Sequence, residues 1–465
     1  METNNNEKQY PPIQLIISAA LIFTLTYKTP YSGIGACIAE GIFLYTIFHW
    51  SKKEARPLRK EAWYAGGIAF LYALMDVMTT STLANSLNMA GFWVSNIFFV
   101  GLGFGLPMIQ RHPLSLLKEL LKTLYQGLPI SSLRKFLHMP DEEKTRPILK
   151  GVIIAIPILI IFFGLFSMAD QNFARASMDV LASITGRNTV ELIYGSVVFV
   201  ALLTGLLLIK ENLFGKYLIF DPQEEKAPSI QQESSIVLSL VNLLFCAFLL
   251  VQSQYLFGGE GYRYENNLNY ADYAVSGFYE LMIVVGLVIF MSISLRTFHK
   301  EAISKTQKIL YCLLLSQSMI ILCSALIRMH LYIDVYGYTQ SRIFGVIFIL
   351  AAGVGLLLTM HNIFREEAQH KLIKRLLLTG AISSLLFGTV QPDLNSARWN
   401  LARQASEQIT SERFFHENQS RDVGTVLALI EIQPQAKADV HYEQFCTVDP
   451  RSFQFNRFQL CQRLK

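Results

Sequence analysis

Long stretches of the chain lack aspartate, glutamate, lysine and arginine, and this feature constrains the fold most strongly. A helix that crosses the hydrocarbon core of a bilayer, about 30 Å thick, needs roughly 20 apolar residues. Only 16% of the 465 residues are charged, against about 25% in an average soluble domain. The composition therefore predicts a polytopic membrane protein and excludes a disordered chain. Seven uncharged stretches have a suitable length: Gln9–Tyr27, Gly151–Ala169, Leu192–Ile209, Ser234–Gly259, Ile309–Ile327, Ile343–Phe364 and Leu376–Pro392.

Four further spans are less plain. Val77–Arg111 is too long for one helix, and its polar centre, Thr79–Asn88, indicates a loop between two spans. Three spans each contain one acid: Gly33–Trp50 around Glu40, Trp63–Thr80 around Asp76, and Tyr273–Leu295 around Glu280. Residues do not alternate between polar and apolar over about ten positions, so a membrane β-barrel is excluded. We expect an all-α polytopic membrane protein with about eleven transmembrane helices.

Lysine and arginine are unevenly divided between the loops. Of these 40 residues, 25 lie in the N-terminus and in the alternate loops that include Lys52–Lys60 and Arg296–Lys308. Six lie in the other loops, and nine lie in the C-terminal tail. Because basic loops remain in the cytoplasm, the N-terminus should be cytoplasmic. With eleven spans, the C-terminal tail should be extracytoplasmic. Cys446 and Cys461 lie in that tail and could therefore form a disulfide.

Three regions follow from these spans. Residues 1–233 form an N-terminal membrane region of about six helices, 234–390 a C-terminal membrane region of about five, and 391–465 a polar tail. The cytoplasmic loop within the first region contains an amphipathic segment, residues 113–138, with leucines spaced three and four apart from Pro113 to Tyr125. This pattern predicts a helix that lies in the membrane interface or one that docks under the bundle.

Ionisable residues inside a membrane are candidates for a functional site, because a charge at the bilayer centre costs roughly 2.5–3.5 kcal/mol. In the predicted topology, every such residue except Glu40 lies at or near the outer boundary. The sequence leaves two interpretations of this cluster open. It is either a polar pocket open to the outside, or an internal salt bridge, with Glu280 paired to Arg328, beside a belt of interfacial tyrosines. The candidate residues are Asp272, Tyr273, Glu280, Arg328, Tyr332, Asp334 and Arg342.

Metal ions, cofactors and nucleic acids are not expected. His330 and Asp334 are spaced to share one helix face, but two ligands do not make a metal site. The chain has no CxxC pair and no Cys/His spacing typical of a metal site. The net charge of +5 is explained by the basic cytoplasmic loops, so it does not indicate nucleic-acid binding.

Several motifs resemble those of a bacterial family of multi-pass membrane proteins that is known only as a domain of unknown function. Residues 272–281, DYAVSGFYEL, are similar to its (S/E)-Y-A-x-x-G-F-x-E-L motif, and Arg328–Arg342 to its R-x-x-x-Y-x-x-x-Y-G-x-T-x-x-R motif. Residues 391–395 and 400–403 resemble its P-D-x-x-I and N-L-x-R motifs. The resemblance covers roughly residues 234–465, and it implies a bacterial plasma-membrane location without implying an activity.

The final motif of that family is less well matched. Asp449–Arg457 resembles D-W-R-S-W-x-x-x-R, but Pro450 and Phe453 replace the two tryptophans. This departure weakens any role for the motif here.

Three classes of function fit these observations. The first is a non-enzymatic membrane protein that binds a ligand or a membrane protein partner at the outer polar cluster, as a sensor or accessory subunit. The second is a secondary transporter, although no internal repeat is evident. The third is a membrane-embedded transferase or hydrolase with Asp272 or Glu280 as base, but no accompanying nucleophile or metal constellation is visible. The lipid bilayer is the one partner that the composition itself implies.

Overall fold

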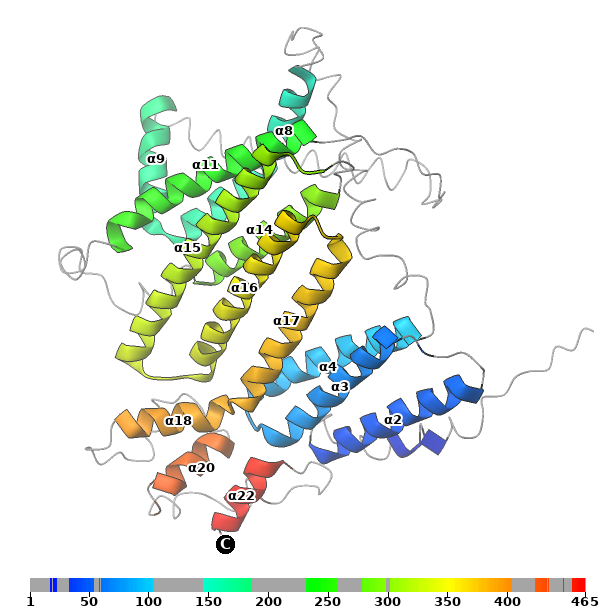
Figure 1. Cartoon of the computed structure of the whole chain (residues 1–465). Helices are drawn as coiled ribbons and strands as arrows, with labels where there is room; N and C mark the ends of the chain where they lie inside the picture. The colour runs from blue at the N-terminus through cyan, green and yellow to red at the C-terminus, as the bar shows by residue number, and fades with distance from the viewer. Residues whose placement is uncertain are drawn as a thin grey trace, which may run out of the picture. The chain divides into compact units, whose positions relative to one another are not determined.

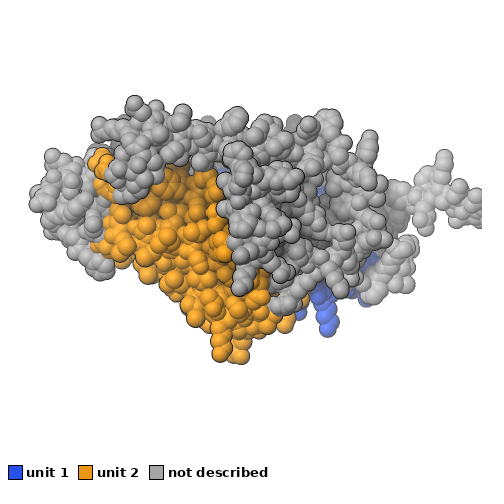
Figure 2. All heavy atoms as spheres, turned by 90° about the horizontal axis from the view of Figure 1, so that it is seen from above, with its two compact units in different colours: residues 1–111, 336–348, 378–465 blue, residues 112–335, 349–377 orange. Residues whose placement is uncertain are grey.

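The computed structural model of the chain is helical wherever it is described, and the described residues contain no strand. Those residues are 17–22 apart from 19, 33–53, 58, 60–103, 145–185, 231–256, 278–297, 302–403, 423–432, 434, 446 and 454–464. They belong to two compact units (Figures 1 and 2). Unit 1 comprises residues 1–111, 336–348 and 378–465, and unit 2 comprises residues 112–335 and 349–377.

The N-terminal part of unit 1 is built from α2 (Ile34–Lys53), α3 (Lys60–Met78) and α4 (Thr82–Gly103). Helix α3 packs against both α2 and α4, around a small core that includes Ile47, Ala62 and Phe99. Gly91 of α4 has a steric role, because a Cβ there would overlap the Tyr72 ring of α3. The two helices therefore approach closely at this point.

The turn between α3 and α4 is shorter than the sequence predicts. Helix α4 begins at Thr82, so the predicted loop Thr79–Asn88 is wrong over most of its length. Asn85 and Asn88 lie in the first turns of α4 instead. Asparagine is a poor helix former, and packing of α4 against α3 overrides that local preference.

The C-terminal part of unit 1 is a helical cap, formed by α18 (Pro392–Arg403), α20 (Val423–Ile432) and α22 (Phe455–Leu464). Helix α20 packs on both α18 and α22, and α22 also contacts α3 (Figure 1). The run Val426–Leu429 is almost fully buried and forms the centre of the cap together with Leu394, Leu401 and Leu460. This apolar run is helical and lies at the centre of the cap.

Unit 2 is built from α8 (Thr145–Ala169), α9 (Gln171–Thr185), α11 (Gln231–Leu256), α14 (Phe278–Thr297) and most of α15 (Lys305–Tyr336). An aromatic cluster joins α8, α9 and α11, and the Phe166 and Phe248 rings within it stack with their centroids 4.0 Å apart. Amide side chains join α11 to α15: Gln307 Nε2 donates to Gln231 O at 2.8 Å, and Asn242 Nδ2 donates to Leu310 O at 3.0 Å. Helices α16 (Gln340–Arg365) and α17 (Gln369–Thr389) belong partly to each unit.

Six of the described helices are long and apolar enough to cross a membrane. They are Lys150–Ala169, Gln231–Ser253, Phe278–Thr297, Lys305–Asp334, Gln340–Arg365 and Gln369–Thr389. Large apolar side chains stay exposed on them, among them Leu243, Leu250 and Ile309, as expected of helices that face lipid. The helices support a membrane location and an all-helical fold.

The six such helices found in the described residues are fewer than the eleven spans that the sequence predicts. The predicted spans around Glu40 and Asp76 do form helices α2 and α3, but the apolar part of α2 is shorter and α3 is not among the six. Neither is α4. The predicted spans Gln9–Tyr27 and Leu192–Ile209 lie mostly or wholly outside the described residues, as does the amphipathic segment 113–138.

The compact units follow different boundaries from the three predicted regions. Unit 1 combines residues 1–111 of the N-terminal region with the whole polar tail, residues 391–465. The tail is thus packed onto helices from the opposite end of the chain.

Candidate functional site

The polar cluster predicted from the sequence is divided between the two units. Glu280, Arg328, Tyr332 and Asp334 belong to unit 2, whereas Arg342 belongs to unit 1. Asp272 and Tyr273 lie outside the described residues.

In unit 2, Arg328 of α15 faces Asp170, which lies between α8 and α9. Arg328 Nη2 is 4.0 Å from Asp170 Oδ2, and both side chains are buried. Asp170 Oδ1 also accepts hydrogen bonds from the backbone N–H groups of Asn172 and Phe173, at 2.9 and 3.1 Å. Asp170 thus caps the N-terminus of α9 and supplies a negative charge to Arg328.

The expected pair of Glu280 with Arg328 is not the pair that forms. Glu280 lies half-buried in the first turn of α14, and within the described residues no ion pair links it to Arg328. Glu280 lies in the helix that directly precedes α15, whereas Asp170 comes from a junction far earlier in the chain. Nearby, Asp334 Oδ2 lies 3.7 Å from His330 Nε2 in an exposed pair, and Tyr332 is half-buried.

In unit 1, Arg342 closes the turn between α15 and α16. Its Nη1 donates to the carbonyl oxygens of Tyr336 and Gly337, at 2.8 and 2.5 Å. Tyr336 is the last residue of α15 and Gly337 follows it. A cation is favourable at the C-terminus of a helix, where carbonyl groups lack intrahelical partners. Gly337 has a φ of +76°, a conformation that suits glycine at the end of a helix.

Asn400 of α18 holds the same turn from the cap. Its Oδ1 accepts a hydrogen bond from Tyr338 N at 2.7 Å, and its Nδ2 donates to Tyr338 O at 2.8 Å. A Cβ at residue 337 would lie 2.7 Å from Asn400 Oδ1, so only glycine leaves room for this amide. Two segments that resemble separate family motifs, Arg328–Arg342 and Asn400–Arg403, therefore meet in one structure.

Asp393 joins the cap to the turn between α3 and α4. It is completely buried, and its Oδ2 accepts hydrogen bonds from Thr80 Oγ1 at 2.6 Å and from Gly424 N at 3.2 Å. A side chain at Gly424 would overlap the Asp393 carboxylate. A single carboxylate thus connects α18, α20 and the α3–α4 turn.

Two further contacts complete the assembly. Gln454, just before α22, donates from Nε2 to the carbonyl oxygens of Asp76 and Thr79, both at 3.2 Å. Ser81 Oγ donates to Gln340 Oε1 at 2.8 Å. The α3–α4 turn, the α15–α16 turn and the cap are therefore held together at one end of unit 1.

A disulfide joins Cys446 to Cys461 of α22. The cap therefore contains a covalent cross-link in addition to its apolar core and its hydrogen bonds.

An aromatic surface lies at this end of unit 1. The Tyr338 and Trp399 rings pack with their centroids 4.9 Å apart, and Trp399 remains 41% exposed and Tyr336 43% exposed. The Arg342 guanidinium lies 5.9 Å from the centroid of the Tyr336 ring. We call Tyr336, Tyr338 and Trp399 the aromatic turn surface.

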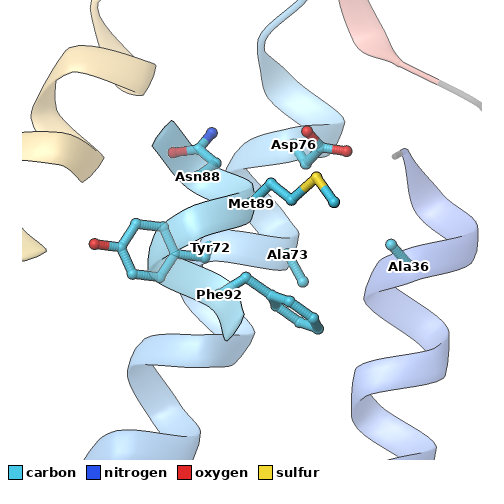
Figure 3. A pocket seen from close by; sticks show the side chains of 7 residues that line it. All are labelled: Ala36, Tyr72, Ala73, Asp76, Asn88, Met89 and Phe92. Carbon is cyan, nitrogen blue, oxygen red and sulfur yellow. The ribbon is translucent and has the colours of Figure 1, made fainter. Parts of the chain in front are cut away.

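A small hollow lies between α2, α3 and α4 (Figure 3). Its lining residues are Ala36, Tyr72, Ala73, Asp76, Asn88, Met89 and Phe92. Sequence reasoning missed this site because it placed Asn88 in a loop. The signal that could have found it is the spacing of Asn85, Asn88 and Asn96, which puts polar side chains on one side of a helix.

The described residues contain no group of three or more His, Cys, Asp or Glu side chains that could hold a metal ion. Many of their polar groups instead fix turns and helix ends, as Asp170, Arg342 and Asn400 do.

The helices and the buried polar contacts define the chain as a helical protein of the membrane type. It belongs to the family described as "Domain of unknown function (DUF4153)", whose model matches residues 37–425. The match covers most of the chain, so the resemblance is not confined to residues 234–465 as the motifs alone indicated. Neither the curated proteins nor the solved structures yield a match.

Proposed function

We propose that the protein is a non-enzymatic, multi-pass protein of the bacterial plasma membrane that binds a partner through the aromatic turn surface. The observation that carries this proposal is the double hydrogen bond between Asn400 and Tyr338. It fixes a short turn so that Tyr336 and Trp399 are held in place while remaining partly exposed. Such a rigid turn is suited to recognition, because its conformational entropy is already lost before binding.

The chemistry of the surface favours a protein partner. Tyrosine and tryptophan are among the residues that most often dominate protein–protein binding energy, and this surface presents two aromatic side chains that are partly exposed, Tyr336 and Trp399. Elsewhere in the cap, Glu431 bridges Arg398 and Arg463, with N–O distances of 2.7 and 3.0 Å. This charged network links α18, α20 and α22 and supports the helix that carries Trp399.

The orientation predicted from the basic loops favours an extracytoplasmic position for this surface. In the predicted orientation, the α3–α4 turn, the α15–α16 turn and the tail all lie on the extracytoplasmic side, and in unit 1 these three segments contact one another. The Cys446–Cys461 disulfide also fits an oxidising compartment. In unit 2, the polar groups of Tyr332 and Asp334 remain candidates for contact with a ligand on the same side.

A secondary transporter is the second candidate function. The observation that favours it is the polar hollow between α2, α3 and α4, since polar groups inside a membrane bundle mark solute and ion pathways.

Site-specific photo-crosslinking in living cells tests partner binding. A benzophenone amino acid at Tyr336 should give a discrete protein adduct, and Trp399→Ala should remove that adduct by deleting half of the aromatic surface. The matched control is the same probe at Tyr45 of α2, which is 67% exposed but lies away from the turn. Adducts with lipid alone, or the same adducts at both positions, would contradict the proposal.

A further inference from the structure

A carboxyl group and an amide form a buried pair between α2 and α4. Glu40 of α2 is 3% exposed, and its Oε2 accepts a hydrogen bond from Asn96 Nδ2 of α4 at 3.4 Å. The same Nδ2 also donates to the Phe92 carbonyl oxygen at 3.2 Å. Because a carbonyl oxygen only accepts, the contact with Phe92 fixes which end of the Asn96 amide is the nitrogen.

The two remaining oxygens of this pair lack hydrogen bonds. Glu40 Oε1 and Asn96 Oδ1 are both buried, and neither has a partner. When Glu40 is ionised, both atoms are acceptors, so neither can satisfy the other. Buried polar atoms without partners are unfavourable, and the pair therefore lacks one hydrogen atom between its two groups.

No positive charge compensates Glu40. None of the ion pairs within the described part of the chain includes it. Helix α4 contains no ionisable residue, and the cationic side chains of α2, including His49, lie in its last turns. An ionised carboxylate without a counter-charge is costly to bury, so this environment favours the neutral acid.

Other ionisable groups near Glu40 are few. The Cys37 thiol precedes it by about one turn of α2. The ionisable residues of α3 are Lys60, Glu61, Tyr64, Tyr72 and Asp76. Lys60 begins α3, at the end of that helix opposite Asp76, and the Tyr72 hydroxyl is hydrogen-bonded to Ser384 Oγ at 2.6 Å.

A proton is the ligand that suits two oxygens. Calcium takes six to eight oxygen ligands, and magnesium demands near-ideal octahedral coordination, so one carboxyl and one amide are too few for either ion. A proton on Glu40 Oε1 turns this atom into a donor for Asn96 Oδ1. The carboxyl and the amide can then share two hydrogen bonds in a ring, and both buried oxygens are satisfied.

The hollow between α2, α3 and α4 provides a route to this pair. Ala36 and Phe92 line the hollow, and Glu40 and Asn96 each lie four residues further along the same two helices, on the same faces. Asp76 lies toward the other end of the hollow (Figure 3), which has room for about one water molecule.

We propose that Glu40 is a proton-binding site, with its acid form held by Asn96, and that it exchanges its proton through the hollow past Asp76. In loading, an O–H bond of a water molecule in the hollow breaks as the O–H bond of Glu40 Oε1 forms, and Asp76 returns a proton to that water. Carboxyl groups inside membrane bundles are the usual elements of proton relays. The site is separate from the aromatic turn surface and does not depend on partner binding there.

Infrared spectroscopy of the full chain in lipid membranes tests the proton on Glu40, because the C=O stretch of a protonated carboxyl is separate from the bands of carboxylates and amides. The wild type should show this band at neutral pH, and Glu40→Gln should lose it. Glutamine can replace the acid form, since it accepts through Oε1 and donates through Nε2, so the variant should fold. Glu61→Gln is the matched control at an exposed position of α3, and it should keep the band.

Asn96→Leu tests the amide partner. This variant should keep the band but move it to higher frequency, because the Glu40 C=O then no longer accepts a hydrogen bond from Asn96 Nδ2. An identical spectrum in this region for the wild type and Glu40→Gln would overturn the proposal. An unshifted band in Asn96→Leu would overturn the pairing with Asn96.

Transfer into heavy water tests the route, since the band moves when the acid proton is replaced by deuterium. Ala36→Val narrows the hollow without removing either member of the pair and should slow this exchange several-fold, and Ala73→Val should do the same from the α3 side. The control is Gly41→Ala, next to Glu40, where a Cβ meets no atom within 4 Å; it should exchange as the wild type does. Equal exchange in all four proteins would overturn the hollow as the route.

Discussion

Asn400 holds the backbone of Tyr338 from both sides, since its side-chain amide accepts from the peptide N–H and donates to the peptide C=O of that one residue. The contact connects helix α18 of the C-terminal cap to the turn between α15 and α16. It gives a structural reason for a glycine at residue 337 and for an asparagine at residue 400, which the sequence presents as unrelated motifs.

Removing this contact should destabilise the protein. Asn400→Leu leaves two backbone groups of Tyr338 without partners, at a cost of about 1–3 kcal/mol for each group that stays buried. Gly337→Ala should also destabilise, because its φ of +76° disfavours alanine by roughly 1–2 kcal/mol and the new methyl group meets Asn400. Thermal unfolding in detergent measures both effects.

The control for these variants is Gly380→Ala. Gly380 lies in α17, and a Cβ there meets no atom within 4 Å, so alanine should stabilise the helix by roughly 0.5–1 kcal/mol. Equal melting temperatures for Gly337→Ala and Gly380→Ala would mean that the turn does not have the described geometry.

The pair of Arg328 and Asp170 should show energetic coupling. Asp170→Asn keeps an oxygen that can cap α9 but removes the charge, so it should cost up to about 3 kcal/mol, the low end for breaking a buried pair. A double-mutant cycle with Arg328→Gln should give a smaller loss in the double variant than the sum of the single losses. For Glu280→Gln and Arg328→Gln, the two losses of stability should instead add in the double variant. Coupling between these two substitutions would mean that Glu280 and Arg328 do pair, as one interpretation of the sequence predicts.

These two contacts show what the sequence could and could not predict. The all-helical class and the six apolar helices follow from uncharged stretches of suitable length, which is a local property. The partner of Arg328 does not follow from a local property of the sequence. It depends on which distant part of the chain packs beside α15, and that part is the junction that contains Asp170. The sequence predicts a loop at Asn88 because Thr79–Asn88 is the polar centre of a long uncharged stretch, whereas packing against Tyr72 through Gly91 keeps this segment helical.

The disulfide in the cap should be present in the native membrane. Cys446 and Cys461 are 15 residues apart, and closing a loop of this length stabilises by about 3 kcal/mol in the chain-entropy model. Reduction should therefore make the cap more sensitive to limited proteolysis, and Cys461→Ser should reproduce this sensitivity without reductant. Identical digestion of the oxidised, reduced and Cys461→Ser proteins would show that the cross-link is absent or without effect.

Glu367, between α16 and α17, should make stability depend on pH in the acid range. The hydrogen bond from Arg375 lowers the pKa of the Glu367 carboxyl, and Arg375 Nη1 lies 2.7 Å from Glu367 Oε2. Because the folded state prefers the ionised form, this stabilisation is present above the unfolded pKa, about 4.3, and is lost as pH falls through the folded value. Melting temperature measured against pH should fall less steeply below pH 4.3 in Glu367→Gln and in Arg375→Gln, and three identical profiles would exclude this contribution.

The most direct test of the account is the side of the membrane on which each end of α16 lies. Single cysteines at Thr339, before α16, and at Glu366, after it, can be labelled with a membrane-impermeant maleimide in intact cells, in a background where Cys37, Cys246, Cys312 and Cys323 are replaced by serine. We expect Thr339→Cys to be labelled in intact cells, because the orientation predicted from the basic loops puts the turn that Asn400 holds on the outer side. Glu366→Cys should be labelled only after permeabilisation. Equal labelling of both cysteines in intact cells, or the reverse pattern, would contradict a membrane-spanning α16 with the cap on the extracytoplasmic side.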